Sequence, residues 1–133
     1  MEETTEKQIW QRVRGAVGTE PEEALRRWLA EQGKLWAAYR SLSRRGGRYR
    51  LLFEQKDRQL SCLRGLLRLR TGQAAARPRC GEAPPDLMAC YGPEARFLEE
   101  LTRNSREPDP ALAALAEGQK KHLCLLLELL GSA

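Results

Sequence analysis

The sequence has a single histidine, no long apolar run and none of the common nucleotide-binding or hydrolytic motifs. No apolar stretch approaches the roughly 18 residues that a membrane-spanning helix needs. The polar, acidic start is unlike a secretory signal peptide. No phosphate loop, Ser-His-Asp order or Rossmann fingerprint occurs, so no catalytic or cofactor-binding residue is assigned. These absences predict a cytoplasmic protein that does not enter a membrane.

The four cysteines form no recognised metal or redox motif. Cys62, Cys80, Cys90 and Cys124 contain no C-x-x-C spacing, which argues against a zinc knuckle or a thioredoxin-type site. The thiols of a cytosolic protein stay reduced. Cys80 and Cys90 share a predicted loop and could pair under oxidation, a pairing that the sequence leaves open. Cys124 lies two residues from His122, so the two side chains point to different helix faces and do not form a Cys-His nucleophile.

The formal net charge is +5, and basic residues gather in residues 40–50 and 63–70. No nucleic-acid motif accompanies them, and aromatic residues are not interleaved as a stacking platform would require. We therefore interpret them as solvated helix faces and do not expect a nucleic-acid partner. The alternative is binding of an anionic partner, which salt-dependent DNA binding would support. Its candidate residues are Arg44, Arg45, Arg48, Arg50 and Arg64.

Apolar residues at helical spacing predict four helices and no strand. The predicted helices cover residues 21–45, 48–70, 86–104 and 110–130, the third either continuous or interrupted at Gly92 and Pro93. Residues 73–85 have no periodicity and are long enough to run the height of a bundle. The sequence thus predicts one all-α domain over residues 1–133, a four-helix bundle with one long crossover and a short N-terminal helical segment, residues 1–18.

Polar residues interrupt the apolar stripe in the middle of every predicted helix. Burying amides or charges without partners is costly, so residues at these positions should form one layer that satisfies itself. Such a layer is either a cofactor site or a hydrogen-bonded belt that fixes helix register. The positions are Gln32 in the first helix, Lys56 and Gln59 in the second, Glu94 in the third, and Gln119 and His122 in the fourth.

These residues supply too few donors for a di-iron site, which takes about four carboxylates and two imidazoles. Glu94 and His122 are the plausible metal donors among them, and the cation of Lys56 would repel a metal ion. Four further carboxylates lie off the stripes and are expected on the flanks or in solvent. They are Glu31, Glu54, Asp57 and Glu117.

The order and spacing of these positions resemble the bacterial ferritin-like, rubrerythrin-related proteins. Their N-terminal segment carries Trp-x-Arg-Val, found here at residues 10–13. Their first helix has a ligand glutamate seven residues before a tyrosine, which corresponds to Gln32 and Tyr39, and then Leu-x-x-Arg, found at residues 42–45. Their second helix reads Glu-x-x-His, matched by Lys56 and Gln59 here, and closes on Leu-x-Thr-Gly at residues 69–72.

The resemblance continues through the last two helices. The last helix of the family reads Ala-x-x-Glu-x-x-His, which corresponds to Ala116, Gln119 and His122 here. Spacing from Leu98 places the third-helix ligand glutamate on Tyr91. Glu94, one turn further on, has the carboxylate that a metal ligand needs. The resemblance covers the chain from Trp10 to Gly131 and implies a ferritin-like fold.

The resemblance also implies a function, because family members bind two irons and act as oxidases, peroxidases or iron-handling proteins. Of the six ligand positions, His122 alone matches. We therefore expect a degenerate member that has lost its di-iron site, binds no cofactor and acts as a structural or interaction module. The alternative is a ferritin-like oxidoreductase or iron-handling protein with iron in a non-standard site. The vestigial metal positions would be Gln32, Lys56, Gln59, Glu94, Gln119 and His122.

Leucines widen the apolar surface of the predicted last helix beyond one stripe. This surface predicts a homodimer through that helix, or else a cover supplied by the N-terminal segment, residues 1–18. The sequence leaves the two open. The leucines are Leu123, Leu125, Leu127 and Leu130.

Overall fold

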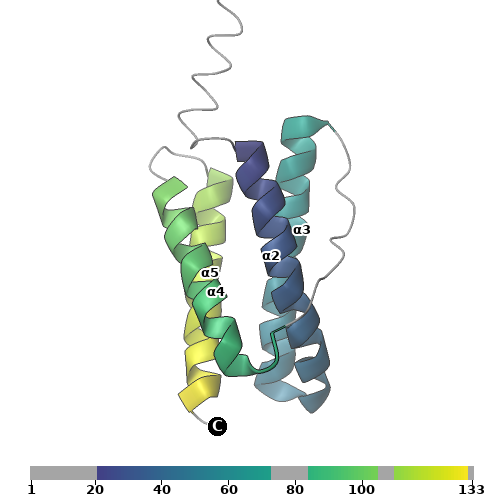
Figure 1. The fold of residues 1–133 in the computed structure, drawn as a ribbon, viewed down its shortest axis with the longest axis vertical. Helices are drawn as coiled ribbons and strands as arrows, with labels where there is room; N and C mark the ends of the chain where they lie inside the picture. The colour runs from purple at the N-terminus through teal and green to yellow at the C-terminus, as the bar shows by residue number, and fades with distance from the viewer. Residues whose placement is uncertain (1–20, 73–83, 105–109, 132–133) are drawn as a thin grey trace, which may run out of the picture.

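A computed structural model describes residues 21–72, 84–104 and 110–131 of the chain. Within these residues the fold is all-helical, as predicted, with no strand. The predictions for residues 1–18, for the crossover at 73–83 and for Cys80 lie outside the described residues. The elements are α2 (Pro21–Leu42), a 3-10 turn η1 (Ser43–Arg45), α3 (Gly47–Thr71), α4 (Leu87–Asn104) and α5 (Pro110–Gly131) (Figure 1).

The helix ends follow from local chemistry. Gly46 and Gly47 adopt positive φ angles of 72° and 56° between η1 and α3, which a residue without a Cβ adopts at little cost. Gly72 ends α3 in the left-handed conformation, and its N–H donates to the Arg68 carbonyl at 2.8 Å. Asp86 caps α4, since its Oδ1 accepts a hydrogen bond from the Ala89 N–H at 2.8 Å.

Helix α4 is continuous through Gly92 and Pro93, so the structure shows no interruption there. A proline inside a helix leaves the carbonyl four residues earlier without its donor. Here that carbonyl belongs to Ala89, which is exposed, so water can supply the missing bond. The proline is therefore tolerated at this position.

Tyr91 of α4, on which spacing from Leu98 placed the third-helix ligand, is 40% exposed and faces away from the core. The buried residues of α4 are Cys90, Glu94, Phe97 and Leu101. Phe97 lies against Trp28 of α2 in an edge-to-face contact, with ring centroids 5.7 Å apart. The large Phe97 ring thus determines which face of α4 points inward.

The core consists of two apolar clusters on either side of the polar layer. On α2 the chain passes from the first cluster at Leu25 and Trp28, through Gln32, to the second cluster at Leu35 and Tyr39. Helix α5 also passes from the first cluster to the second, whereas α3 and α4 pass from the second cluster to the first. The first cluster contains Leu25, Trp28, Leu29, Leu60, Leu63, Leu67, Phe97, Leu101, Leu112, Leu115 and Ala116. The second contains Leu35, Ala38, Tyr39, Leu52, Cys90, Leu125, Leu126 and Leu129.

This order defines the topology. Helices α2 and α3 form one antiparallel pair, α4 and α5 form another, and α3 and α4 run parallel. The end of α3 and the start of α4 therefore lie at opposite ends of the bundle, as a long crossover requires (Figure 1). None of the described helices combines the length and apolarity needed to cross a membrane.

A buried polar layer at the centre of the bundle

All six predicted polar residues lie in one layer at mid-height, between the two apolar clusters. Five of them are completely buried, and Gln59 is 6% exposed. Each comes from a position between apolar residues on its helix, so packing of the four apolar faces brings the polar side chains together. The prediction that they converge is confirmed. They are Gln32 on α2, Lys56 and Gln59 on α3, Glu94 on α4, and Gln119 and His122 on α5.

Lys56 is the hub of the layer. Its Nζ donates to Gln59 Oε1 at 2.6 Å, to Glu94 Oε1 at 2.8 Å and to Gln32 Oε1. Three acceptors around one nitrogen require three N–H donors, which an ammonium has and a neutral amine lacks. Burial lowers the pKa of Lys56 from its ordinary value, and the adjacent Glu94 carboxylate opposes this shift. The geometry therefore assigns Lys56 as a cation paired with Glu94.

Two glutamines link the hub to α5. The Gln59 amide nitrogen donates to Gln119 Oε1 at 2.8 Å. Gln119 in turn donates to the Glu94 carbonyl at 2.9 Å and to the Glu94 carboxylate at 3.0 Å. Each of the two amides accepts through its oxygen and donates through its nitrogen. The hydrogen bonds therefore run in one direction, from Lys56 through Gln59 and Gln119 to Glu94, and they fix the register of α3, α4 and α5.

The second carboxylate oxygen of Glu94 faces α2 and α5. Tyr39 donates its hydroxyl to Glu94 Oε2 at 2.8 Å, and His122 Nε2 faces the same oxygen. The other ring nitrogen, His122 Nδ1, lies 2.8 Å from Gln55 Oε1 on α3. One carboxylate thus contacts groups from all three of the other helices.

The ionisation of the layer follows from these contacts. Burial alone would raise the pKa of Glu94, but the charges and hydrogen bonds of Lys56 and His122 hold it well below its usual range. Burial lowers the pKa of His122, with Glu94 acting against the shift. Both ring nitrogens face an oxygen, Nε2 that of Glu94 and Nδ1 that of Gln55, so a neutral imidazole donates to one of the two. The layer then holds one positive and one negative charge.

Neighbouring groups at the edge of the layer stay in their protonated forms. Burial raises the pKa of the Tyr39 hydroxyl far above its usual value, and the Glu94 carboxylate adds to the shift. Burial raises the pKa of the Cys90 thiol to about 11. Cys90 is a free thiol whose Sγ lies 3.4 Å from the Asp86 carbonyl, so it is a buried hydrogen-bonded group rather than a nucleophile.

The donor set of the layer does not fit a di-iron centre. Glu94 and His122 are its two donors of a kind that iron prefers, and the ammonium of Lys56 lies between the helices that would supply the others. Across residues 21–72, 84–104 and 110–131, no group of three or more His, Cys, Asp or Glu side chains could hold a metal ion. The off-stripe carboxylates do not join the layer, since Glu31 and Glu54 are partly exposed and Asp57 and Glu117 exposed.

One amide departs from the expectation of a fully satisfied layer. Gln32 accepts from Lys56 through its oxygen, but its Nε2 is buried and makes no hydrogen bond to the described residues. A buried donor without a partner costs about 1–3 kcal/mol. Gln32 therefore satisfies only its oxygen within the described layer.

Two members of the network were not predicted from the sequence. Tyr39 was matched to a family tyrosine but not placed in the polar layer, yet its hydroxyl donates to Glu94. Its position seven residues after Gln32 was the available signal, because that spacing places both on one face. Gln55 lies off the stripe beside Lys56, and no sequence pattern distinguishes it from other partly exposed residues of α3.

Tyr39→Phe is expected to lower the free energy of unfolding by about 1–2 kcal/mol, because it removes a charge-assisted hydrogen bond while keeping the ring. Urea unfolding of the two proteins measures the difference. Tyr49→Phe is the matched control, since Tyr49 on α3 is partly exposed and its hydroxyl donates to none of the described residues. Equal effects of the two substitutions would contradict the role assigned to Tyr39.

The surface residues singled out in the sequence lie mostly in contacts within the chain. Arg48 pairs with Glu128 at 2.9 Å, and Arg50 pairs with Glu54 at 3.3 Å, both exposed to solvent. Of the four leucines of α5, Leu125 is buried, Leu123 and Leu130 pack partly buried against the second cluster, and Leu127 is 47% exposed. The apolar surface left for a partner is therefore smaller than the sequence suggested.

The layer is a self-contained polar network around a buried ion pair in an all-helical bundle. Comparisons of the chain with protein-family profiles, with curated proteins and with solved structures gave no match.

Proposed function

We propose that this protein is a degenerate, rubrerythrin-related ferritin-like protein that works without a metal, as a structural or interaction module. In this proposal the ion pair of Lys56 and Glu94 replaces the di-iron centre. The observation that carries it is the threefold hydrogen bonding of the Lys56 ammonium at mid-bundle. The Lys56 ammonium neutralises the Glu94 carboxylate. In a di-iron protein the metal ions neutralise the carboxylates at this place.

The substitutions at the other positions support the same proposal. Glutamine has the shape of glutamate without its charge, so Gln32 and Gln119 occupy ligand positions without mutual repulsion. The parallel arrangement of α3 and α4 agrees with the crossover of a ferritin-like bundle. A homodimer through α5 and a cytoplasmic location belong to the proposal as predictions, with the exposed Leu127 as the dimer's starting contact.

Iron analysis of the purified protein tests the proposal. After anaerobic incubation with ferrous iron, exposure to air and gel filtration, plasma emission is expected to find far less than one iron per chain. A positive control is the variant Gln32→Glu/Lys56→Glu/Gln59→His/Gln119→Glu, which restores carboxylates and an imidazole at the family's positions. Iron retained by this variant and not by the parent supports the proposal.

Two irons held tightly by the parent protein would overturn it. A near-ultraviolet absorption band of an oxo-bridged pair in that sample would instead support the alternative, a ferritin-like oxidoreductase with a non-standard site. Failure of the variant alone, with a metal-free parent, would argue against the ferritin-like assignment.

A further inference from the structure

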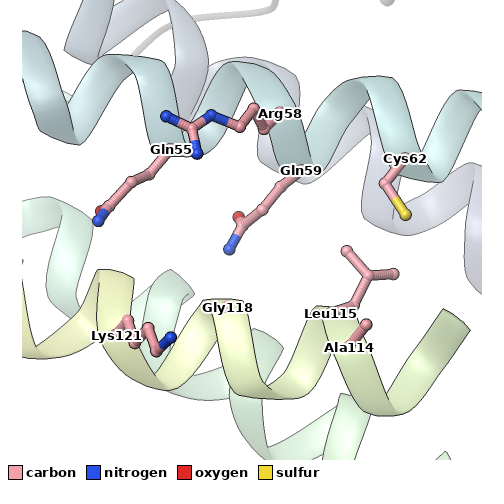
Figure 2. A pocket seen from close by; sticks show the side chains of 8 residues that line it. All are labelled: Gln55, Arg58, Gln59, Cys62, Ala114, Leu115, Gly118 and Lys121. Carbon is pink, nitrogen blue, oxygen red and sulfur yellow. The ribbon is translucent and has the colours of Figure 1, made fainter. Parts of the chain in front are cut away.

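A cavity of ≈ 340 Å³ that is open to solvent lies between α3 and α5. Figure 2 shows Gln55, Gln59 and Cys62 directed from α3 toward α5, with Leu115 rising from α5 to meet them. Gly118 leaves the α5 side of this space without a side chain. The volume is at the small end of the about 300–1,000 Å³ typical of small-molecule sites, so any occupant must be small.

The polar side chains of the lining are two glutamine amides and two cations. Arg58 and Lys121 contribute two cations, and neither makes an ion pair with the described residues. Among the residues that the structure describes, no carboxylate lines the cavity. An excess of donors and positive charge, with no acidic residue to balance it, favours an anion, and the planar guanidinium of Arg58 suits a carboxylate.

The two glutamines of the wall are held in place by the buried layer. Gln59 is fixed by Lys56 and Gln119, and one N–H of its amide remains. Gln55 is held by His122, and its own amide donates to none of the other described residues. Binding of a ligand costs little additional side-chain entropy here, because the orientation of these two side chains is already fixed.

The end of the cavity near Cys62 is apolar. Leu115 and Ala114 of α5 face the Cys62 thiol there, away from Lys121 (Figure 2). A ligand that lies along the cavity would therefore place its charge beside Lys121 and Arg58 and its apolar part against Leu115. A fully polar anion such as phosphate would leave this end of the cavity unfilled.

From these contacts we infer that the cavity between α3 and α5 binds a small alkyl carboxylate. Its carboxylate is held by Arg58, Lys121 and the Gln55 amide, and its alkyl chain lies over Gly118 against Leu115. The inference is independent of the proposed function, because it needs no statement about metal in the polar layer.

Titration of the full-length, ¹⁵N-labelled protein with octanoate tests the inference. Saturable amide shifts are expected at Gly118 and at the side-chain amides of Gln55 and Gln59, with no comparable shift at Gly65 on α3. Octylamine, which has the same chain and the opposite charge, is expected to give none. Acetate, which has the charge and almost no chain, is expected to bind at least about tenfold more weakly.

Two variants locate the binding. Arg58→Gln/Lys121→Gln is expected to weaken octanoate binding at least about tenfold, whereas Arg68→Gln/Lys120→Gln, with the same charge change on the same helices, keeps it. Gly118→Leu is expected to abolish binding by filling the cavity. A Cβ at Gly118 meets nothing within 4 Å, and the same holds at Gly65, so Gly65→Leu is the matched control.

Several results would overturn the inference. These are the absence of a saturable shift at Gly118 with millimolar octanoate, equal responses to octylamine and octanoate, or full retention of binding in Gly118→Leu. Far-ultraviolet circular dichroism of each variant separates loss of binding from loss of fold.

Discussion

Replacement of Lys56 by methionine is expected to lower the free energy of unfolding by about 3–5 kcal/mol. The methionine fills a similar volume, but it leaves the Glu94 carboxylate buried without its cation and removes the donor to Gln32 and Gln59. Both charged side chains are fully buried, so solvent cannot compensate for the loss. Urea unfolding followed by circular dichroism measures the change.

The double variant Lys56→Met/Glu94→Gln separates the cost of an unpaired charge from the cost of lost packing. It is expected to be more stable than Lys56→Met, because removal of both charges leaves no buried ion without a partner. The matched surface control is Arg50→Met, which breaks the exposed pair of Arg50 and Glu54 and is expected to cost less than about 1 kcal/mol. A Lys56→Met variant as stable as Arg50→Met would contradict the central role of the ion pair.

Acidification from pH 7.5 to pH 5.5 is expected to lower the free energy of unfolding by about 1 kcal/mol through His122. Burial lowers the pKa of His122 below its ordinary 6.5, so the unfolded chain binds a proton in this window that the folded protein does not. Stability is therefore complete above pH 6.5 and declines as the pH falls toward the folded-state pKa.

The single histidine makes this prediction simple to check. One imidazole proton resonance, followed by NMR as the pH is lowered, reports the folded-state pKa of His122 directly. The variant His122→Phe is expected to flatten the dependence of stability on pH between 7.5 and 5.5. A measured pKa at or above 6.5 would show instead that Glu94 holds His122 as a cation, and the sign of the pH dependence would reverse.

A second loss of stability is expected at lower pH, since the folded-state pKa of Glu94 lies below its ordinary value of 4.5. The stabilisation by the Glu94 carboxylate is present above pH 4.5 and is lost as the pH falls below it. The His122→Phe variant retains this second decline, which distinguishes the two groups.

Much of the fold could be predicted because periodicity is a local property of the chain. The spacing of Leu112, Leu115, Leu126 and Leu129 defines the buried face of α5 without reference to any other helix. Gly72 ends α3 close to the predicted boundary, whereas α2 ends at Leu42 and residues 43–45 form a 3-10 turn instead of the predicted last helical turn. The prediction for α4 was wrong at Tyr91 because its apolar residues support two neighbouring phases, and the contact of Phe97 with Trp28 selects one.

The sequence by itself determined the four helices and the six polar residues of the layer, because apolar spacing places residues on one helix face whatever that face packs against. Which polar atoms pair was decided by the tertiary structure. The three acceptors around Lys56 come partly from α2 and α4, distant in the chain, and the partner of His122 is Gln55, which has no distinguishing pattern. The cavity between α3 and α5 is likewise a property of the packing, since Gly118 and Arg58 become one site only when the two helices meet.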